Sequence, residues 1–239
     1  MHESSKADVW DRLAPEYAAQ RAADPVYRSC IVQAIEALQP AGTVLDAGCG
    51  TGMSTRYLLH CEQVEALDFS TASLEALHAN LGGRKNLDIV HADLRELPFP
   101  DASFDCVLCA NTLQHLSPQV QPRAVAELLR VLKPHGRYAV SAHHYSRYKR
   151  RKRWIKEGRP GQPGIDYMFR FSRAELARLL PGSHIRAAGF YALPGRAQNF
   201  AARWLGKALV HLQVGHMLIA YGQKPHRRLK TRYPPQRTL

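Results

Sequence analysis

A glycine-rich turn directly after a strand-like run is the feature that most constrains this chain. Residues 44–54 read VLDAGCGTGMS, in which an apolar run ends in Asp46 and is followed by Gly48, Gly50 and Gly52. Glycine tolerates positive φ and lets the backbone approach a ligand closely, so the pattern is typical of a strand-to-helix turn beside a bound molecule. The sequence therefore predicts a binding site at the carboxyl end of this strand.

The spacing of these glycines argues against a phosphate ligand. A dinucleotide-binding turn needs Gly-x-Gly-x-x-Gly, whereas Met53 follows Gly52 here, and the Gly-Lys-Ser/Thr of a Walker loop is absent. The carboxylate of Asp46 would repel a pyrophosphate. A ligand with a cationic or hydrogen-bond-donating part is favoured instead.

Strand-like and helix-like runs alternate along most of the chain, which favours a parallel sheet with helices on both faces. The expected strands are residues 43–48, 63–68, 87–93, 104–110, 137–144, 184–193 and 215–223. The expected helices are residues 5–38 with a break near Asp24-Pro25, 53–60, 70–81, 119–132, 172–180 and 196–214. No internal repeat is found.

The positive charge of the chain is concentrated in two runs. Residues 147–159 contribute +7 and residues 224–239 contribute +6 to the formal net charge of +13, so the rest of the chain is balanced. Local basic runs favour polyanions such as RNA, anionic lipid or phosphorylated substrates. The alternative is a solvated loop at 146–171 and a disordered tail at 226–239.

Cysteine usage and hydropathy bear on the compartment. Five cysteines lie in mostly apolar contexts, which favours reduced, buried thiols over a disulfide framework. Cys106 and Cys109 would point to opposite faces of a strand, and no second Cys pair is present, so no metal site is expected. No apolar run is long enough to cross a bilayer, and the first residues lack an apolar signal segment. We expect a cytoplasmic protein.

The motifs around the glycine turn resemble those of a known family. VLDAGCGTG at 44–52 resembles motif I of the class I S-adenosylmethionine-dependent methyltransferases. The resemblance continues with Asp68 in EALDFS, Asp93 in HADLRELPFPDASFDCV, NTLQHL at 111–116 and LLRVLKPHGRYAVS at 128–141. It is closest to small-molecule enzymes of the ubiquinone and menaquinone type.

This resemblance implies a fold and a domain organisation. The fold would be α/β, a doubly wound Rossmann-like sheet of seven strands whose last strand is antiparallel, with a helical cap. Residues 1–225 would form one domain. Its additions would be N-terminal cap helices at 1–40, a basic lid insertion at 146–171 and a lid helix at 196–214, followed by the basic tail at 226–239.

The resemblance also implies S-adenosylmethionine as the cofactor, a sulfonium nucleoside without phosphate. Asp46 would hold its ammonium group, Asp68 would accept from both ribose hydroxyls, and Asp93 would accept from the adenine amino group. The other residues expected near the cofactor are Tyr17, Arg21, Gly48, Cys49, Gly50, Gly52, Phe69, Leu94 and Asn111. Ordinary turn chemistry or packing is the alternative for each, and packing is our interpretation of Cys49.

Methyl transfer is an in-line attack on an activated methyl group, so alignment supplies much of the catalysis. A base is needed only if the nucleophile arrives protonated. The candidates at the carboxyl edge of the sheet are His115, His143 and His144, each of which could instead only hydrogen-bond a neighbour.

Three functions stay open. The first is methyl transfer to a small molecule, aromatic or acidic, since several aromatic residues could line the acceptor site. The second is an RNA (tRNA) methyltransferase, because RYKRRKRW at 147–154 interleaves basic and aromatic residues. The third is a non-catalytic binding module, against which the intact set of glycines and acids argues. The sequence does not indicate an oligomeric state.

Overall fold

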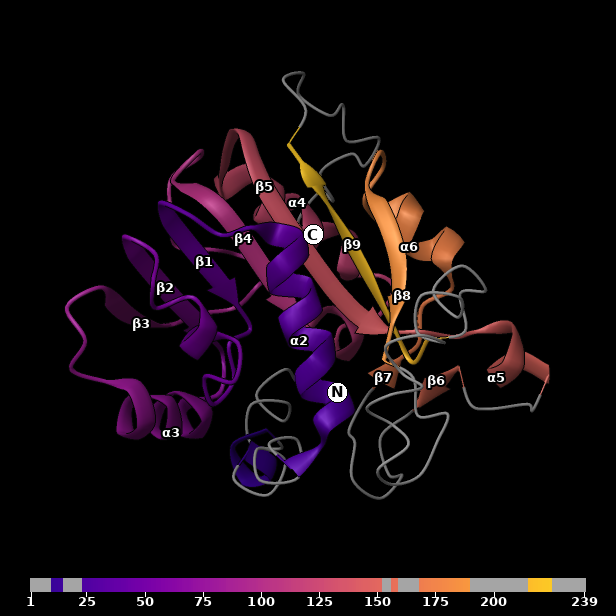
Figure 1. Cartoon of the computed structure of the whole chain (residues 1–239), viewed down its shortest axis with the longest axis horizontal. Coiled ribbons are helices and arrows are strands. Elements are labelled where there is room, and N and C mark those ends of the chain that lie inside the picture. Colours follow the sequence, from indigo (N-terminus) through magenta and orange to yellow (C-terminus); the bar gives the residue numbers. More distant parts are fainter. Residues whose placement is uncertain (1–9, 15–22, 152–155, 159–167, 190–214, 225–239) are drawn as a thin grey trace, which may run out of the picture.

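A computed structural model describes residues 10–14, 23–151, 156–158, 168–189 and 215–224. Seven strands form one sheet in the order β3-β2-β1-β4-β5-β9-β8 (Figure 1). They are β1 (Thr43–Ala47), β2 (Gln63–Asp68), β3 (Leu87–His91), β4 (Phe104–Ala110), β5 (Leu132–His143), β8 (His184–Ala188) and β9 (Met217–Gln223). Strands β1 to β5 are parallel, and β9 is antiparallel to both β5 and β8. The predicted fold class is confirmed, including the reversed last strand.

The strand order places a ligand crevice beside β1. The chain moves from β1 to β2 and β3 on one side, and then crosses to β4 and β5 on the other. In open parallel sheets, ligands bind at the carboxyl ends of the strands where this reversal occurs. The turn after β1 and the end of β4 therefore flank the expected crevice.

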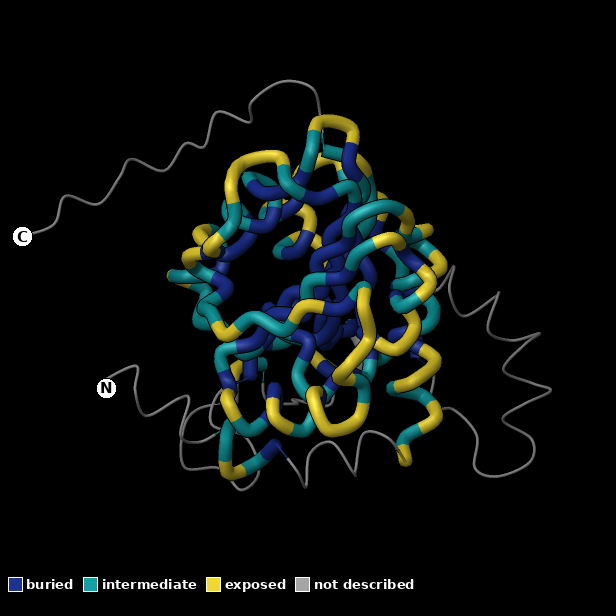
Figure 2. Tube along the Cα trace, turned by 90° about the vertical axis from the view of Figure 1, so that its left-hand side faces the viewer, coloured by how far each residue is buried: buried dark blue, intermediate teal, exposed yellow. Residues whose placement is uncertain are grey.

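Alternate residues of the strands serve two separate cores. Leu45 of β1 packs in a cluster with α4 (Gln121–Val131) and α6 (Arg173–Leu179), whereas Val44 packs in a second cluster with α2 (Pro25–Leu38) and α3 (Thr71–Leu81). In Figure 1, α2 crosses in front of the sheet and α4 lies behind it. Cys106 and Cys109 belong to different clusters, as the strand pattern predicts. Figure 2 shows the buried residues in the middle of the molecule and the exposed ones on its loops and outer helix faces.

Several helix ends follow from capping residues. Asp24 accepts hydrogen bonds from Val26 N and Tyr27 N, and Pro25 follows it, so α2 begins at the predicted break. Ser70 caps α3. Ser172 and Glu175 form the capping box of α6.

The predicted helix at 53–60 is wrong. Residues 51–60 form turns around a single 3₁₀ turn, η1 (Thr55–Tyr57), with hydrogen bonds three residues apart such as Leu58 N to Thr55 O. The hydroxyl groups of Ser54 and Thr55 donate to the buried carboxylate of Asp46. These bonds draw the segment inward, and a side-chain partner of this kind competes with regular helix formation.

Other boundaries differ by a few residues. β3 ends at His91, two residues before Asp93, and β5 begins at Leu132, so α4 ends at Val131. The predicted basic insertion contains α5 (Arg147–Arg151) and a short hairpin of β6 (Glu157–Gly158) with β7 (Met168–Phe169). The predicted helix at 196–214, much of the N-terminal cap and the tail lie outside the described residues.

All five cysteines are free and buried, as their apolar contexts predict. None of the described helices has the length and apolar character needed to cross a membrane.

Candidate functional site

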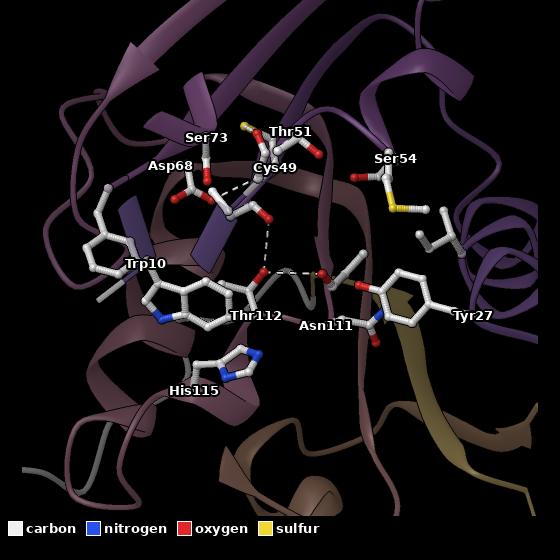
Figure 3. Close-up of a pocket in the computed structure, with 17 residues that line it drawn as sticks. Trp10, Tyr27, Cys49, Thr51, Ser54, Asp68, Ser73, Asn111, Thr112 and His115 are labelled. Carbon is white, nitrogen blue, oxygen red and sulfur yellow. Dashed lines mark hydrogen bonds between the residues drawn. The ribbon is translucent and has the colours of Figure 1, made fainter. Parts of the chain in front are cut away.

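A cavity opens at the carboxyl ends of β1, β2 and β4 (Figure 3). It encloses about 740 Å³ of space, counting the open solvent at its mouth. Its walls come from the N-terminal segment, α2, the glycine turn, the start of α3 and the residues after β4. Among the residues that the structure describes, the lining includes one carboxylate, Asp68, and neither lysine nor arginine.

The three glycines of the turn all have positive φ but serve different neighbours. A Cβ atom on Gly48 would lie 2.3 Å from the side chain of Thr112, whose Oγ1 donates to Gly48 O at 3.0 Å. A Cβ atom on Gly52 would meet Leu77 and Leu81 of α3. Only at Gly50 would the added atom meet nothing within 4 Å. Gly50 is therefore the glycine that leaves open space toward the cavity.

Asp68 joins β2, the glycine turn and the cavity. Its Oδ2 accepts from Gly50 N at 2.9 Å and its Oδ1 accepts from Ser70 N at 3.0 Å. Burial raises the pKa of this carboxyl group, and the backbone N–H donors oppose that shift. Each oxygen still has a lone pair for a hydroxyl donor, because a carboxylate accepts about four hydrogen bonds.

Asp46 lies behind the turn. Its side chain is fully buried and accepts from Ser54 Oγ and Thr55 Oγ1, both at 2.8 Å. Burial raises the pKa of Asp46 to about 6, against the lowering by these two hydroxyl groups. Asp46 does not line the cavity, and its hydrogen bonds with Ser54 and Thr55 instead hold the turn in place. A contact of Asp46 with an ammonium group stays a prediction.

Asp93 and Leu94 also lie away from the cavity wall. Asp93 Oδ1 accepts from Arg95 N and from Arg95 Nε, both at 2.8 Å. Leu94 packs in the core cluster on the α4 face of the sheet. Phe69 does line the cavity. Adenine contacts of Asp93 and Leu94 remain untested predictions.

Asn111 enters the cavity from the end of β4 in an unusual backbone conformation, with φ of 59°. Its Oδ1 accepts from Ser141 Oγ at 3.1 Å, and its N–H donates to Ser141 O at 3.0 Å. The side chain is buried, and within the described part of the chain its Nδ2 has no hydrogen-bond partner. A buried donor of this kind is costly unless a ligand accepts from it.

The structure separates the three candidate histidines. His115 lines the cavity and meets Trp10 edge-on, with ring centroids 4.7 Å apart. His143 is buried at the end of β5 against His216, and His144 Nδ1 donates to Gly215 O at 2.9 Å. Burial lowers the pKa of His144. Neither His143 nor His144 lines the cavity.

Asp11, which no sequence motif indicates as a site residue, ties the N-terminal segment to the site. Asp11 Oδ1 accepts from Ser70 Oγ at 2.6 Å and from Ala72 N at 3.2 Å. This contact joins the segment that carries Trp10 to the start of α3. The sequence gives no periodic signal for it, because the two segments are 59 residues apart. Tyr17 and Arg21 lie outside the described residues.

No group of three or more potential metal ligands occurs in the part of the chain that the structure covers.

Comparisons with known proteins agree with the fold and the motifs. Residues 45–140 match the family described as a methyltransferase domain. A demethylmenaquinone methyltransferase of Clavibacter sepedonicus is 42% identical over 99 residues, which is 41% of this chain and 39% of that protein. The chain thus spans well under half the length of this relative.

Solved structures extend the likeness to most of the chain. A methyltransferase of Haloferax volcanii, solved in complex with the methyltransferase activator Trm112, has a TM-score of 0.66 at 21% identity over 91% of this chain and 98% of that one. The cyclase SpnF has a TM-score of 0.62 at 18% identity over 92% of this chain and 94% of that one. At such identities the likeness shows the fold alone.

The glycine turn, the acid at the end of β2 and the motif after β4 meet at one cavity, and they fall within or beside the matched segment. Residues 45–140 therefore match the family described as a methyltransferase domain, in agreement with the class I methyltransferase motifs of the sequence.

Proposed function

We propose that this chain binds S-adenosylmethionine at the cavity and transfers its methyl group to a small-molecule acceptor. The observation that carries this proposal is the placement of Asp68. Its carboxylate is fixed by Gly50 N and Ser70 N at the cavity wall, directly beside the glycine that leaves open space. A ribose diol offers two hydroxyl donors that suit the two carboxylate oxygens.

The charge of the cavity supports the same ligand. A nucleotide phosphate needs lysine, arginine or a cradle of N–H groups, whereas the described lining offers one carboxylate and no lysine or arginine. A sulfonium nucleoside with an ammonium group is compatible with that carboxylate. The Nδ2 group of Asn111 would donate to an oxygen atom of the bound molecule.

When bound, S-adenosylmethionine would supply an activated methyl group for the acceptor to attack. The chain's own contribution is to bind and align the two molecules and to exclude water. The cavity walls are largely apolar and include Trp10, Tyr27, Ile31, Met53 and Phe69. Such walls suit an acceptor with an apolar or aromatic part. The demethylmenaquinone in the name of the Clavibacter relative is an acceptor of this kind.

Calorimetry with S-adenosylmethionine and S-adenosylhomocysteine tests the cofactor. We expect one site per chain for each compound, and no heat with either would refute the proposal. A screen of small-molecule fractions with methyl-labelled cofactor tests the reaction. Cofactor binding without transfer to any fraction, or to bulk tRNA, would identify a non-catalytic module.

A further inference from the structure

A buried glutamine lies between the last residue of β5 and the histidine of the cavity wall. Gln114 belongs to η2 (Leu113–His115) and has no exposed surface. Its Oε1 accepts from the backbone N–H of His143 at 2.8 Å, and its Nε2 lies 3.4 Å from Nε2 of His115.

The backbone contact fixes the orientation of the amide. A backbone N–H can only donate, so the oxygen of Gln114 has to face His143. The NH₂ group then has to face His115, and an amide NH₂ can only donate. The Nε2 atom of His115 must therefore accept, which places the proton of a neutral ring on Nδ1.

We propose that Gln114 is a positioning residue that holds His115 as the neutral imidazole protonated on Nδ1. The unprotonated nitrogen is directed at Gln114. The proton on Nδ1 makes that nitrogen a hydrogen-bond donor to any partner it contacts. His115 therefore serves the cavity as a hydrogen-bond donor and an aromatic wall, whereas the sequence predicts a general base.

The tautomer itself can be observed without cofactor or acceptor. In the full chain labelled with ¹⁵N-histidine, long-range proton–nitrogen correlation spectra at mildly alkaline pH distinguish the two ring nitrogens. The His115 signals are assigned by their loss in His115→Phe. We expect Nδ1 of His115 to be the protonated nitrogen, and a spectrum with the proton on Nε2 would overturn the proposal.

Two substitutions test the cause. In Gln114→Glu, one carboxylate oxygen still accepts from His143 N while the other presents an acceptor to His115, so we expect the proton to move to Nε2. In Gln114→Met the amide donor is lost, and we expect a mixture of tautomers. An unchanged Nδ1–H tautomer in both variants would show that Gln114 does not set it.

Gln121→Met is the matched control. Gln121 is also buried and donates from Nε2, at 2.9 Å, to Leu116 O, and among the described residues no hydrogen bond joins it to His115. We expect its spectrum to keep the wild-type tautomer. If Gln114→Glu does not fold, the wild-type and Gln114→Met spectra still decide the matter.

The assignment of a role in methyl transfer rests on the proposed function, but the tautomer does not. A chain that shows Nδ1–H on His115 and binds no S-adenosylmethionine would refute the proposed function and leave this inference standing. A chain that shows Nε2–H on His115 and binds S-adenosylmethionine would overturn this inference and leave the proposed function standing.

Discussion

Asp68 combines a structural position with a place on the cavity wall in one side chain. It holds the glycine turn through Gly50 N, begins the next turn through Ser70 N, and still faces the cavity. A carboxylate can accept about four hydrogen bonds, so we expect lone pairs beyond those used by Gly50 N and Ser70 N to accept from a ligand.

We expect Asp68→Ala to weaken S-adenosylhomocysteine binding at least tenfold, since two charge-assisted hydrogen bonds would be lost. Calorimetry measures the effect. Asp88→Ala is the control, because Asp88 is an exposed acid on the edge strand β3 that contacts Gln63. Wild-type affinity in Asp68→Ala would contradict the ribose assignment.

Alanine substitutions at Gly48 and Gly50 should have different effects on stability and on cofactor affinity. Left-handed backbone costs a non-glycine residue about 1–2 kcal/mol at either position. Gly48→Ala adds a clash with Thr112, which costs about 1–3 kcal/mol more, so urea unfolding should show the larger loss of stability there. Gly50→Ala should keep most of its stability and lose cofactor affinity. Equal stability losses would show that Thr112 does not impose the glycine.

The raised pKa of Asp46 predicts that the stability of the fold depends on pH. Its pKa of about 6 in the folded state exceeds that of an unfolded aspartate, about 3.9, so between these values the folded chain holds a proton that the unfolded chain releases. The contribution of Asp46 to stability therefore falls as pH rises from about 4 to 6, by at most about 3 kcal/mol. Urea unfolding of the wild type and Asp46→Asn across this range measures it. The same pH profile in both proteins would rule out Asp46 as its source.

Among the described structural elements, the N-terminal segment contributes part of the cavity wall. Trp10 and Ala14 form part of the wall, and Asp11 joins their segment to the start of α3. Two hydrogen bonds thus couple a short helical piece to the turn that carries Asp68.

Asp11→Ala should loosen this wall and lower cofactor affinity several-fold, with little loss of overall stability. Calorimetry with S-adenosylhomocysteine and the denaturation midpoint measure the two effects. Asp105→Ala provides the comparison, because Asp105 accepts from Thr43 N and Lys133 Nζ at the other end of β1. An affinity loss of similar size in Asp105→Ala would show that the effect is not local.

At the scale of the whole molecule, the net charge of +13 does not by itself indicate an RNA substrate. Lys149, in the middle of the basic run, is buried and donates from Nζ to His144 O at 2.8 Å. Burial lowers the pKa of Lys149 to about 8. This lysine anchors α5 to the sheet, while Arg150 and Arg151 are exposed.

We expect any affinity for bulk tRNA to be non-specific and to fall steeply with salt. Arg150→Ala/Arg151→Ala should lower the slope of log affinity against log salt by at most about 2, and should leave cofactor binding unchanged. Filter binding over a range of salt concentrations measures the slope. Methyl transfer to tRNA that is lost in this double variant would favour the RNA function.

The sequence alone indicated most of the strands, the glycine turn and the position of Asp68, because strand periodicity, glycine spacing and capping residues such as Ser70 and Ser172 are local properties of the chain. The arrangement of the sheet and its reversed last strand followed from the family resemblance. Tertiary structure decided the rest. Asp46 turned inward because β1 is buried on both faces and Ser54 and Thr55 could reach it, and the helix expected there became a 3₁₀ turn. The contacts of Asp11 with Ser70 and of Gln114 with His143 join segments 59 and 29 residues apart, so only the packed sheet could bring them together.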